Sequence, residues 1–210
     1  LIDECHSRGI AVIIDVVYNH ASGQNPFYRM WNDDGGGYGG QATASNPFFN
    51  ATAKHAYNVF NDMNHDSPAT NEYIERIVTY WINEFKIDGF RWDLTKGFTQ
   101  YCPDGDEGCT NDLNRDRVKV LKDYADYQWA SDPNFYVIFE HLGIIQEEKQ
   151  WADYRAGEGK GIMLWNKLTD PYNEATMGYN SNSNFESAFY TTKGFDGPSG
   201  VTYMESHDEE

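Results

Sequence analysis

Apolar and polar positions follow each other along the chain in a way that predicts strands and helices in turn. Two short runs, Val12-Ile13-Ile14 and Val137-Ile138-Phe139, are continuously apolar, which is typical of strands buried in a parallel sheet. Residues 67–85 instead carry apolar side chains at helical spacing, and Ser67 followed by Pro68 is a typical helix start. The pattern predicts strands at 11–17, 87–94, 135–139, 161–168 and 201–204, and helices at 1–9, 67–85, 113–129 and 144–154.

Strands that alternate with helices predict an α/β fold built on a parallel sheet. One long stretch, residues 21–66, breaks the alternation, because it has no clear period and is rich in Gly, Asn, Asp and aromatic residues. A loop of this length inside a compact domain is usually a functional excursion or a small subdomain. Its Tyr28, Trp31 and Tyr38 are candidates for flat surfaces on which a sugar ring could pack.

The composition narrows the kinds of partner that the chain can bind. With 210 residues the chain is long enough for one domain with a sizeable core. Aromatic residues make up 16% of it, and such rings suit sugars, protein cores and protein interfaces alike. The net charge of −17 argues against nucleic acid or an anionic membrane as partner, since both would repel the surface. No run is long and apolar enough to cross a membrane.

Two cysteines bear on the cellular location. Cys102 and Cys109 flank a short loop and could close it as a disulfide, which would imply an oxidising compartment, although two free thiols fit the sequence almost as well. The chain shows no signal peptide, but it begins inside a helical pattern without a cap and therefore looks like a piece of a longer protein. We expect an extracellular, periplasmic or cell-surface location, with the targeting region outside this sequence.

Polar side chains gather where the predicted strands end. They are Asn19, His20, Arg91, Asp93, Glu140, His207 and Asp208. In parallel α/β sheets the carboxyl ends of the strands form the edge at which ligands bind. Arg91 and Asp93 lie two apart on one strand, so they project to the same face, and a guanidinium favours the charged form of a neighbouring carboxylate. Taken alone, this pair is more typical of a buried salt bridge. Together with the other carboxylates at the same edge, it predicts acid–base chemistry, with glycoside cleavage as the leading case.

Four segments in this order resemble the four signature regions of the α-amylase family of glycoside hydrolases. They are Asp15-Val16-Val17-Tyr18-Asn19-His20, Gly89-Phe90-Arg91-Trp92-Asp93, Glu140 after its apolar strand, and Ser206-His207-Asp208. The resemblance implies a (β/α)₈ TIM barrel, of which the whole chain would form strands about three to seven. Strands one, two and eight would lie outside this sequence. Residues 21–66 would correspond to a domain B-like insertion within the barrel.

The resemblance also implies roles for the catalytic carboxylates. Asp93 would be the nucleophile of a retaining double displacement, and Glu140 the general acid and base. Asp208 would bind sugar hydroxyls and stabilise the transition state. Arg91 would hold Asp93 in place, and Asp15 would be a buried support for Arg91.

Other residues in these segments would contact the substrate or a metal. The resemblance implies substrate contacts for His20, His207, Tyr18 and Lys96. Asn19 matches a residue that ligates a structural calcium ion in many members, and no organic cofactor is expected. Lys96 is followed by Gly97, where many α-amylases have a histidine, so one sugar contact of that position is lost here while the carbonyl is kept. Glu205, Glu209 and Glu210 are interpreted as supporting or solvent-facing.

The expected activity is hydrolysis of α-1,4-glucosidic bonds in starch-like α-glucans or malto-oligosaccharides. Within the family, a transglycosylase or a debranching enzyme is the alternative, and Tyr18 in the first segment is often seen in such members. Outside the enzymes, the alternative is a family member that has lost its activity and serves for binding. The presence of Asp93, Glu140 and Asp208 together argues against that last hypothesis.

Overall fold

The computed structural model describes residues 1–208, and its centre is a parallel sheet of five strands. Along the sheet the strands are β1 (Ile13–Val16), β4 (Gly89–Trp92), β5 (Tyr136–Phe139), β6 (Met163–Lys167) and β7 (Gly200–Tyr203). Each strand therefore pairs with the one that follows it in this sheet along the chain, as in successive βα units. The predicted α/β fold with a parallel sheet is confirmed.

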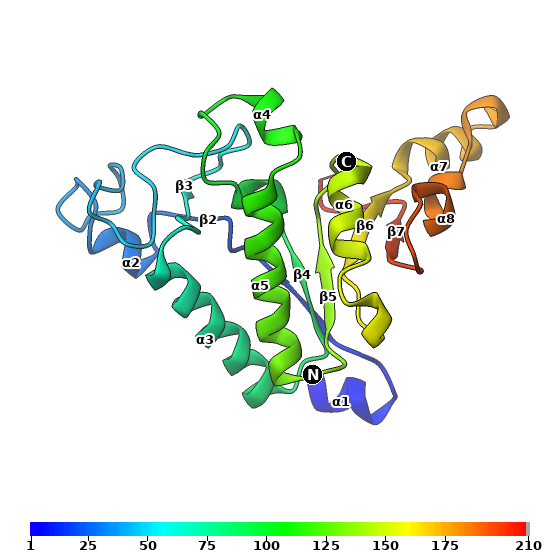
Figure 1. The fold of residues 1–210 in the computed structure, drawn as a ribbon, viewed down its shortest axis with the longest axis horizontal. Helices are drawn as coiled ribbons and strands as arrows, with labels where there is room; N and C mark the ends of the chain where they lie inside the picture. The colour runs from blue at the N-terminus through cyan, green and yellow to red at the C-terminus, as the bar shows by residue number, and fades with distance from the viewer. Residues whose placement is uncertain (209–210) are drawn as a thin grey trace.

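Three helices, α3 (Pro68–Phe85), α5 (Arg115–Ser131) and α6 (Ile145–Ala152), lie on one side of the sheet (Figure 1). The start of α3 is set locally, because Ser67 Oγ accepts the N–H of Ala69 and Pro68 occupies the first turn. Its apolar face buries Ile74, Val78 and Ile82, which are spaced four residues apart and so lie on one side of the helix.

The main core fills the space between the sheet and these helices. Phe90 and Trp92 alternate with Arg91 along β4, so the two rings point into the core while Arg91 points to the opposite face. Tyr124 of α5 stacks on Trp92 with 5.7 Å between ring centroids, and Phe139 of β5 meets Trp92 edge-on at 6.2 Å. Part of the aromatic content of the sequence thus packs in this layer.

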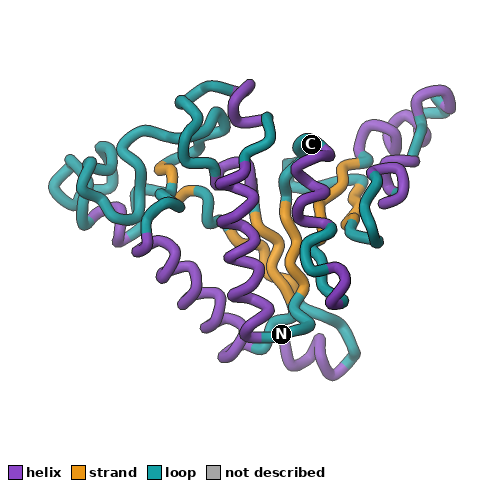
Figure 2. Tube along the Cα trace, in the orientation of Figure 1, coloured by secondary structure: helices purple, strands orange, loops and turns teal. Residues whose placement is uncertain are grey.

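In Figure 2 the strands lie behind these helices, and some side chains on the opposite face of the sheet are exposed. Ile13 of β1 is 39% exposed and Tyr136 of β5 is 47% exposed. The prediction of a strand buried on both faces at residues 11–17 is therefore wrong in part. β1 is shorter, and it is only half-buried because within the described residues it stands at the edge of the sheet with β4 as its one neighbour.

Residues 21–66 fold around a small core of their own. The segment contains α2 (Pro26–Arg29), and two short strands, β2 (His20–Ala21) and β3 (Asn61–Asp62), pair in antiparallel fashion at its base. The core consists of Tyr28, Ala42, Phe49 and Met63. Tyr28 is 1% exposed and its hydroxyl donates to the carbonyl of Gly39, so it cannot serve as a sugar platform.

The remaining elements are short. They are α1 (Ile2–Ser7), η1 (Thr95–Phe98), α4 (Glu107–Asn111), η2 (Ala156–Glu158), α7 (Thr169–Thr176), η3 (Asn180–Asn182), η4 (Glu186–Ala188) and α8 (Tyr190–Lys193). A disulfide joins Cys102 to Cys109 ahead of and within α4, so the first of the two sequence alternatives holds. None of the helices in residues 1–208 is both long and apolar enough to span a membrane.

Candidate active site

One guanidinium stands at the centre of the predicted site. Arg91 Nη1 lies 2.7 Å from Asp15 Oδ1 and 2.9 Å from Asp93 Oδ1, and Nη2 lies 2.8 Å from Glu140 Oε2. Arg91 is 4% exposed, so these contacts are formed largely away from water. Three carboxylates that are far apart in the sequence thus converge on a single cation.

The backbone fixes the two predicted catalytic carboxylates just beyond their strands. Asp93 donates its N–H to the carbonyl of Val16 at 2.9 Å, and Glu140 donates its N–H to the carbonyl of Trp92 at 3.0 Å. Thr95 in turn donates its N–H to the carbonyl of Glu140 at 2.8 Å. Because β4 and β5 are neighbours in the sheet, Asp93 and Glu140 emerge side by side at its carboxyl edge.

A strained turn follows Asp93 and points at Glu140. Leu94 has φ +40°, a left-handed conformation that a residue with a branched side chain adopts at a cost of about 1–3 kcal/mol. In this conformation its N–H donates to Glu140 Oε2 at 2.8 Å. The same carboxylate oxygen is therefore held by both Leu94 and Arg91. Sequence reasoning had no signal for this turn, since a leucine is not a residue that predicts positive φ.

The surroundings of Glu140 favour its protonated form. Burial raises the pKa of Glu140 above its usual range, the charges of Asp93 and Asp208 raise it further, and the Leu94 N–H and Arg91 oppose the shift. Arg91 reaches Glu140 from the neighbouring strand, although it is far from Glu140 in the sequence. The net direction is still upward, as a general acid requires.

Asp15 supports Arg91 as predicted, but it is not buried. Its carboxylate pairs with Arg91 across the β1–β4 register, in which the two residues are directly opposite each other. The side chain is nevertheless 54% exposed. The reason is that β1 is the edge strand and its face toward Arg91 is open to solvent.

The histidines and the third carboxylate lie at the rim of the site. His207 Nε2 is 3.4 Å from Asp208 Oδ1 and 4.0 Å from Asp93 Oδ1. The side chains of His207 and Asp208 are more than half exposed. His20 reaches the site from β2, and burial lowers its pKa while the charge of Asp93 opposes that shift. Glu209 and Glu210 lie outside the described residues.

The two remaining predicted substrate contacts lie deeper or farther away. Tyr18 meets Trp92 edge-on with 5.2 Å between centroids and packs against the main core, and burial raises its pKa. Lys96 sits in η1 with Nζ 5.2 Å from the ring centroid of Tyr57, and burial together with the charge of Arg117 lowers its pKa. Sugar contacts of Tyr18 and Lys96 stay predictions.

Asn19 has a structural role that sequence reasoning did not predict. It is fully buried, and its Nδ2 donates to the carbonyls of Asp93 at 3.0 Å and Leu94 at 3.1 Å, which fixes the turn after Asp93. Its Oδ1 has no hydrogen-bond partner, and the same is true of Asp62 Oδ1. The Nε2 of His55, which is itself fully buried, lies 3.3 Å from Asp62 Oδ1. Across residues 1–208, no group of three or more His, Cys, Asp or Glu side chains could hold a metal ion.

Trp165 of β6 was also missed. The Arg91 guanidinium carbon lies 3.7 Å from its ring centroid, and the ring of His207 is 6.2 Å away. A cation over an aromatic face is attracted by the ring, so Trp165 supports Arg91 in addition to the carboxylates. Its place in the predicted strand 161–168 gave the only signal, because alternate residues of that strand point toward the site.

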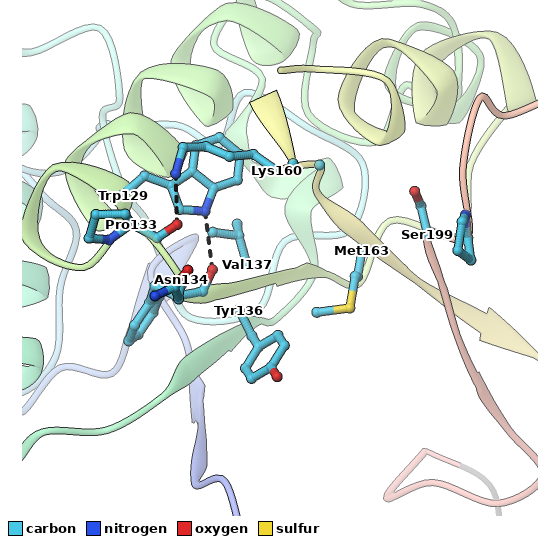
Figure 3. Close-up of a pocket in the computed structure, with 12 residues that line it drawn as sticks. Trp129, Pro133, Asn134, Tyr136, Val137, Lys160, Met163 and Ser199 are labelled. Carbon is cyan, nitrogen blue, oxygen red and sulfur yellow. Dashed lines mark hydrogen bonds between the residues drawn. The ribbon is translucent and has the colours of Figure 1, made fainter. Parts of the chain in front are cut away.

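A separate hollow of about 340 Å³ opens at the other end of the sheet (Figure 3). Asn134, Tyr136 and Met163 line it at the amino ends of β5 and β6. Lys160 closes one side through a hydrogen bond from Nζ to the carbonyl of Pro133 at 2.7 Å. Because ligands of parallel α/β sheets bind at the carboxyl ends of the strands, we assign the site to the Arg91 group and not to this hollow.

The chain is similar to several known sequences. No protein-family model matches the chain. Over 151 residues, covering 63% of the chain, it is 30% identical to the malto-oligosyltrehalose trehalohydrolase of Saccharolobus solfataricus and spans 24% of that protein. It is 36% identical over 102 residues to the chloroplastic isoamylase SU1 of Zea mays, covering 47% of the chain and 12% of that protein. It is 34% identical over 114 residues to the cyclomaltodextrin glucanotransferase of Geobacillus stearothermophilus, covering 46% of the chain and 16% of that protein. The chain thus spans about a quarter or less of the length of these relatives.

Solved structures agree on the fold. A debranching enzyme of Nostoc punctiforme, soaked with acarbose, superposes with a TM-score of 0.64 at 21% identity, covering 99% of this chain and 46% of that chain. The type I pullulanase of Bacillus subtilis, in complex with maltose, superposes with a TM-score of 0.52 at 19% identity, covering 79% of this chain and 20% of that chain. At these identities the likeness concerns the fold alone.

Proposed function

The chain belongs to the α-amylase family of glycoside hydrolases, and from this premise we propose that it holds the reaction centre of a retaining enzyme acting on α-1,4-linked glucans. One observation carries the proposal, namely the joint contact of Asp93 and Glu140 with Arg91 at the ends of adjacent strands. We further propose that the five-stranded sheet is the part of a (β/α)₈ barrel from strand three to strand seven, with residues 21–66 as its domain B. The match to nearly the whole chain by part of the Nostoc enzyme supports this barrel assignment.

The proposed mechanism has two displacements. In the first, a carboxylate oxygen of Asp93 attacks the anomeric carbon, the bond to the leaving oxygen breaks, and Glu140 gives its proton to that oxygen. In the second, Glu140 takes a proton from water, and the water oxygen displaces Asp93 from the anomeric carbon. The raised pKa of Glu140 suits the first step, since the proton must be present at the start. Asp208, His20 and His207 would hold the hydroxyls of the reacting sugar.

The stereochemistry of the first product tests this mechanism. Proton NMR of the full-length protein acting on a malto-oligosaccharide should show the new reducing end first as the α-anomer. Asp93→Ala should lose turnover while it still binds the glucan. Appearance of the β-anomer first would mean inversion and would contradict the assignment of Asp93 as nucleophile.

A debranching or transglycosylating activity is the second candidate, favoured by the similarity to an isoamylase and a cyclomaltodextrin glucanotransferase. Digestion of a branched glucan separates the possibilities. Release of linear chains alone would indicate debranching, and longer or cyclic products from a short oligosaccharide would indicate transfer. A family member used only for binding would release no reducing sugar at all.

We also propose a calcium ion between the sheet and residues 21–66. Two buried oxygens without hydrogen-bond partners, Asn19 Oδ1 and Asp62 Oδ1, are the type of ligand that calcium prefers. The ion would rest on these and on main-chain carbonyls, and it would have a structural role only. Chelation should then lower Tm, and elemental analysis should find calcium. An unchanged Tm and no metal would contradict the proposal and leave His55 as the neighbour of Asp62 Oδ1.

The disulfide between Cys102 and Cys109 supports a proposed location in an oxidising compartment, outside the cell or in the periplasm. Fractionation of the native host followed by thiol labelling would test it. Recovery of the protein in the cytosol with both thiols free would contradict the proposal.

A further inference from the structure

A fully buried ionic cluster lies directly behind Glu140. Arg117 of α5 donates from Nε to Glu147 Oε1 at 2.9 Å and from Nη2 to Glu147 Oε2 at 2.6 Å. His141 Nε2 lies 3.0 Å from the same Oε2. The three side chains are between 0% and 1% exposed. Burying these charges costs several kcal/mol before their pairing is counted, so such a cluster is not a cheap way to stabilise a fold.

The protonation states in the cluster follow from its surroundings. Burial alone would raise the pKa of Glu147, but hydrogen bonds from His141 and Arg117 lower it below the usual range. Burial lowers the pKa of His141 to about 4. Glu147 is therefore a carboxylate that can only accept, and neutral His141 must carry its proton on Nε2. The other ring nitrogen, Nδ1, then carries the lone pair and faces Thr95 Oγ1.

Thr95 connects the cluster to both catalytic strands. Its hydroxyl donates to the carbonyl of Glu140 at 2.8 Å, and the same Oγ1 lies 3.1 Å from His141 Nδ1. That carbonyl also accepts the Thr95 N–H at 2.8 Å, so Thr95 is fixed against Glu140 through both its backbone and its hydroxyl. Thr95 follows Asp93 by two residues, and His141 follows Glu140 directly. The cluster thus holds the backbone behind the nucleophile and behind the acid at once.

We propose that Arg117, Glu147, His141 and Thr95 are positioning residues that keep the carboxyl of Glu140 aimed at the leaving oxygen. This inference rests on the proposed function of Glu140. Two further observations support it. Leu142, next in the chain, has φ +50°, so the segment after Glu140 leaves the strand through a strained turn that needs an anchor. Arg117 Nη1 also donates to the carbonyl of Lys96 at 3.2 Å, which anchors the turn after Asp93.

The test compares a substrate that needs the general acid with one that does not. kcat/KM of the full-length protein is measured on a malto-oligosaccharide and on a maltosyl derivative whose leaving group is a dinitrophenolate. kcat/KM reports the first displacement, in which protonation matters only for the poor leaving group. In Thr95→Val, which removes the hydroxyl and keeps the shape, we expect about a 10-fold loss or more on the oligosaccharide and less than about a threefold loss on the activated substrate.

Matched variants separate positioning from simple loss of stability. Thr95→Ser keeps the hydroxyl and should keep both rates. Glu147→Gln should resemble Thr95→Val if it folds. Tyr124→Phe removes another buried hydroxyl of α5, which hydrogen-bonds with His65 Nδ1 at 2.9 Å and with Asn71 Oδ1 at 2.7 Å. This variant should lower Tm without changing the ratio of the two rates.

The outcomes are distinct. Equal losses on both substrates, or no loss in Thr95→Val, would overturn the positioning role and leave the proposed function intact. If the unmodified protein hydrolyses neither substrate, the proposed function fails, and the inference fails with it.

Discussion

Arg91 is the residue on which the geometry of the site depends. It contacts Asp15, Asp93 and Glu140 through two nitrogens, and its flat face rests on Trp165. A planar guanidinium can serve several oxygens and a ring together, whereas an ammonium is a single point charge. The arrangement therefore needs arginine and not merely a positive charge.

Replacement of Arg91 by lysine should lower kcat/KM by about 100-fold, because one ammonium cannot hold both of the proposed catalytic carboxylates and small misplacements are that costly. The measurement is hydrolysis of a malto-oligosaccharide. Arg155→Lys is the matched control, since Arg155 pairs with Asp126 and Glu158 at the surface. Retention of activity within threefold in Arg91→Lys would argue against this view of the site.

The raised pKa of Glu140 predicts a stability effect that depends on pH. The unfolded residue ionises near its usual value of 4.5 and the folded residue ionises only at higher pH. Glu140 thus contributes stability below the unfolded pKa and loses that contribution as pH rises through the folded pKa. Glu140→Gln cannot ionise, so it should raise Tm relative to the parent at about pH 7. The gain in Tm should shrink toward about pH 4. An equal gain at both pH values would contradict a raised pKa of Glu140 as its cause.

The same pKa should set the alkaline limit of activity. As pH rises through the pKa of Glu140, the acid is lost and kcat/KM on an oligosaccharide should fall. On the dinitrophenyl substrate, which needs no proton, that fall should be absent. A fall of the same size on both substrates would assign the limit to another group.

Residue-level predictability differed between local and long-range features. Asp93 and Glu140 could be placed at neighbouring strand ends from the sequence, because strand ends and strand order follow local patterns. The Arg91–Glu140 contact could not, since it depends on how β4 and β5 are aligned. The contacts of Glu147 could not be predicted either. They depend on the packing of α5 on α6, which brings Arg117, 30 residues earlier, and His141, 6 residues earlier, to the same carboxylate.

Among the elements, the loop between η1 and α5 contains the disulfide and binds residues 21–66 through several hydrogen bonds, which we call the clasp. Thr110 Oγ1 accepts the N–H of Ala56 at 2.9 Å, and Asn111 Nδ2 donates to the hydroxyl of Tyr57 at 2.6 Å. Gln100 Nε2 donates to the carbonyl of Met63 at 3.0 Å. The loop therefore ties the irregular segment to the carboxyl edge of the sheet, next to the candidate site.

Opening this loop should loosen the clasp. With Cys102→Ser and Cys109→Ser together, loss of the short covalent ring should cost about 2–3 kcal/mol of unfolding free energy. Amide hydrogen exchange at Ala56 should speed up, because its acceptor Thr110 follows the ring directly. Cys5→Ser changes the free thiol and is the control. Unchanged exchange at Ala56 would show that the clasp does not need the disulfide.

Element boundaries were predictable where the signal lies in the sequence itself. The helix predicted at 67–85 is α3 at Pro68–Phe85, because its cap and its first-turn proline are adjacent residues. Its end at Lys86, with φ +54°, has no such signal, since a glycine is the usual residue in that conformation. The predicted strand 11–17 shortens to Ile13–Val16 because pairing with one neighbour, and not hydrophobicity, decides where an edge strand ends.

At the scale of the whole molecule, the sheet has two outer strands. β1 and β7 each pair on one side within residues 1–208, and exposed apolar side chains flank them, including Ile13 at 39% and Met204 at 48% exposure. Unpaired strand edges with apolar neighbours are templates for association with other chains. The open face of the sheet adds Tyr136, which is 47% exposed.

We therefore expect residues 1–210, produced alone, to self-associate and to lack activity on glucan. Light scattering after size-exclusion chromatography measures the association, and reducing-sugar release measures the activity. The full-length protein at the same concentration is the control. A soluble monomer of residues 1–210 with a cooperative thermal transition and measurable hydrolysis would refute this expectation.

Because three carboxyl groups contact the single cation Arg91, the site carries an unbalanced charge before a ligand binds. One positive charge faces the carboxyl groups of Asp15, Asp93 and Glu140, with Asp208 close by, so carboxyl groups outnumber the cation before any sugar arrives. A neutral glucose ring, the proposed substrate, cannot offset the negative charge of these carboxyl groups. In the proposed reaction the sugar becomes positively charged at its anomeric carbon only as the bond breaks. At that moment this positive charge offsets the excess negative charge of the site. A ring-shaped amine, protonated at the corresponding position, should accordingly bind more tightly than the neutral sugar of the same shape.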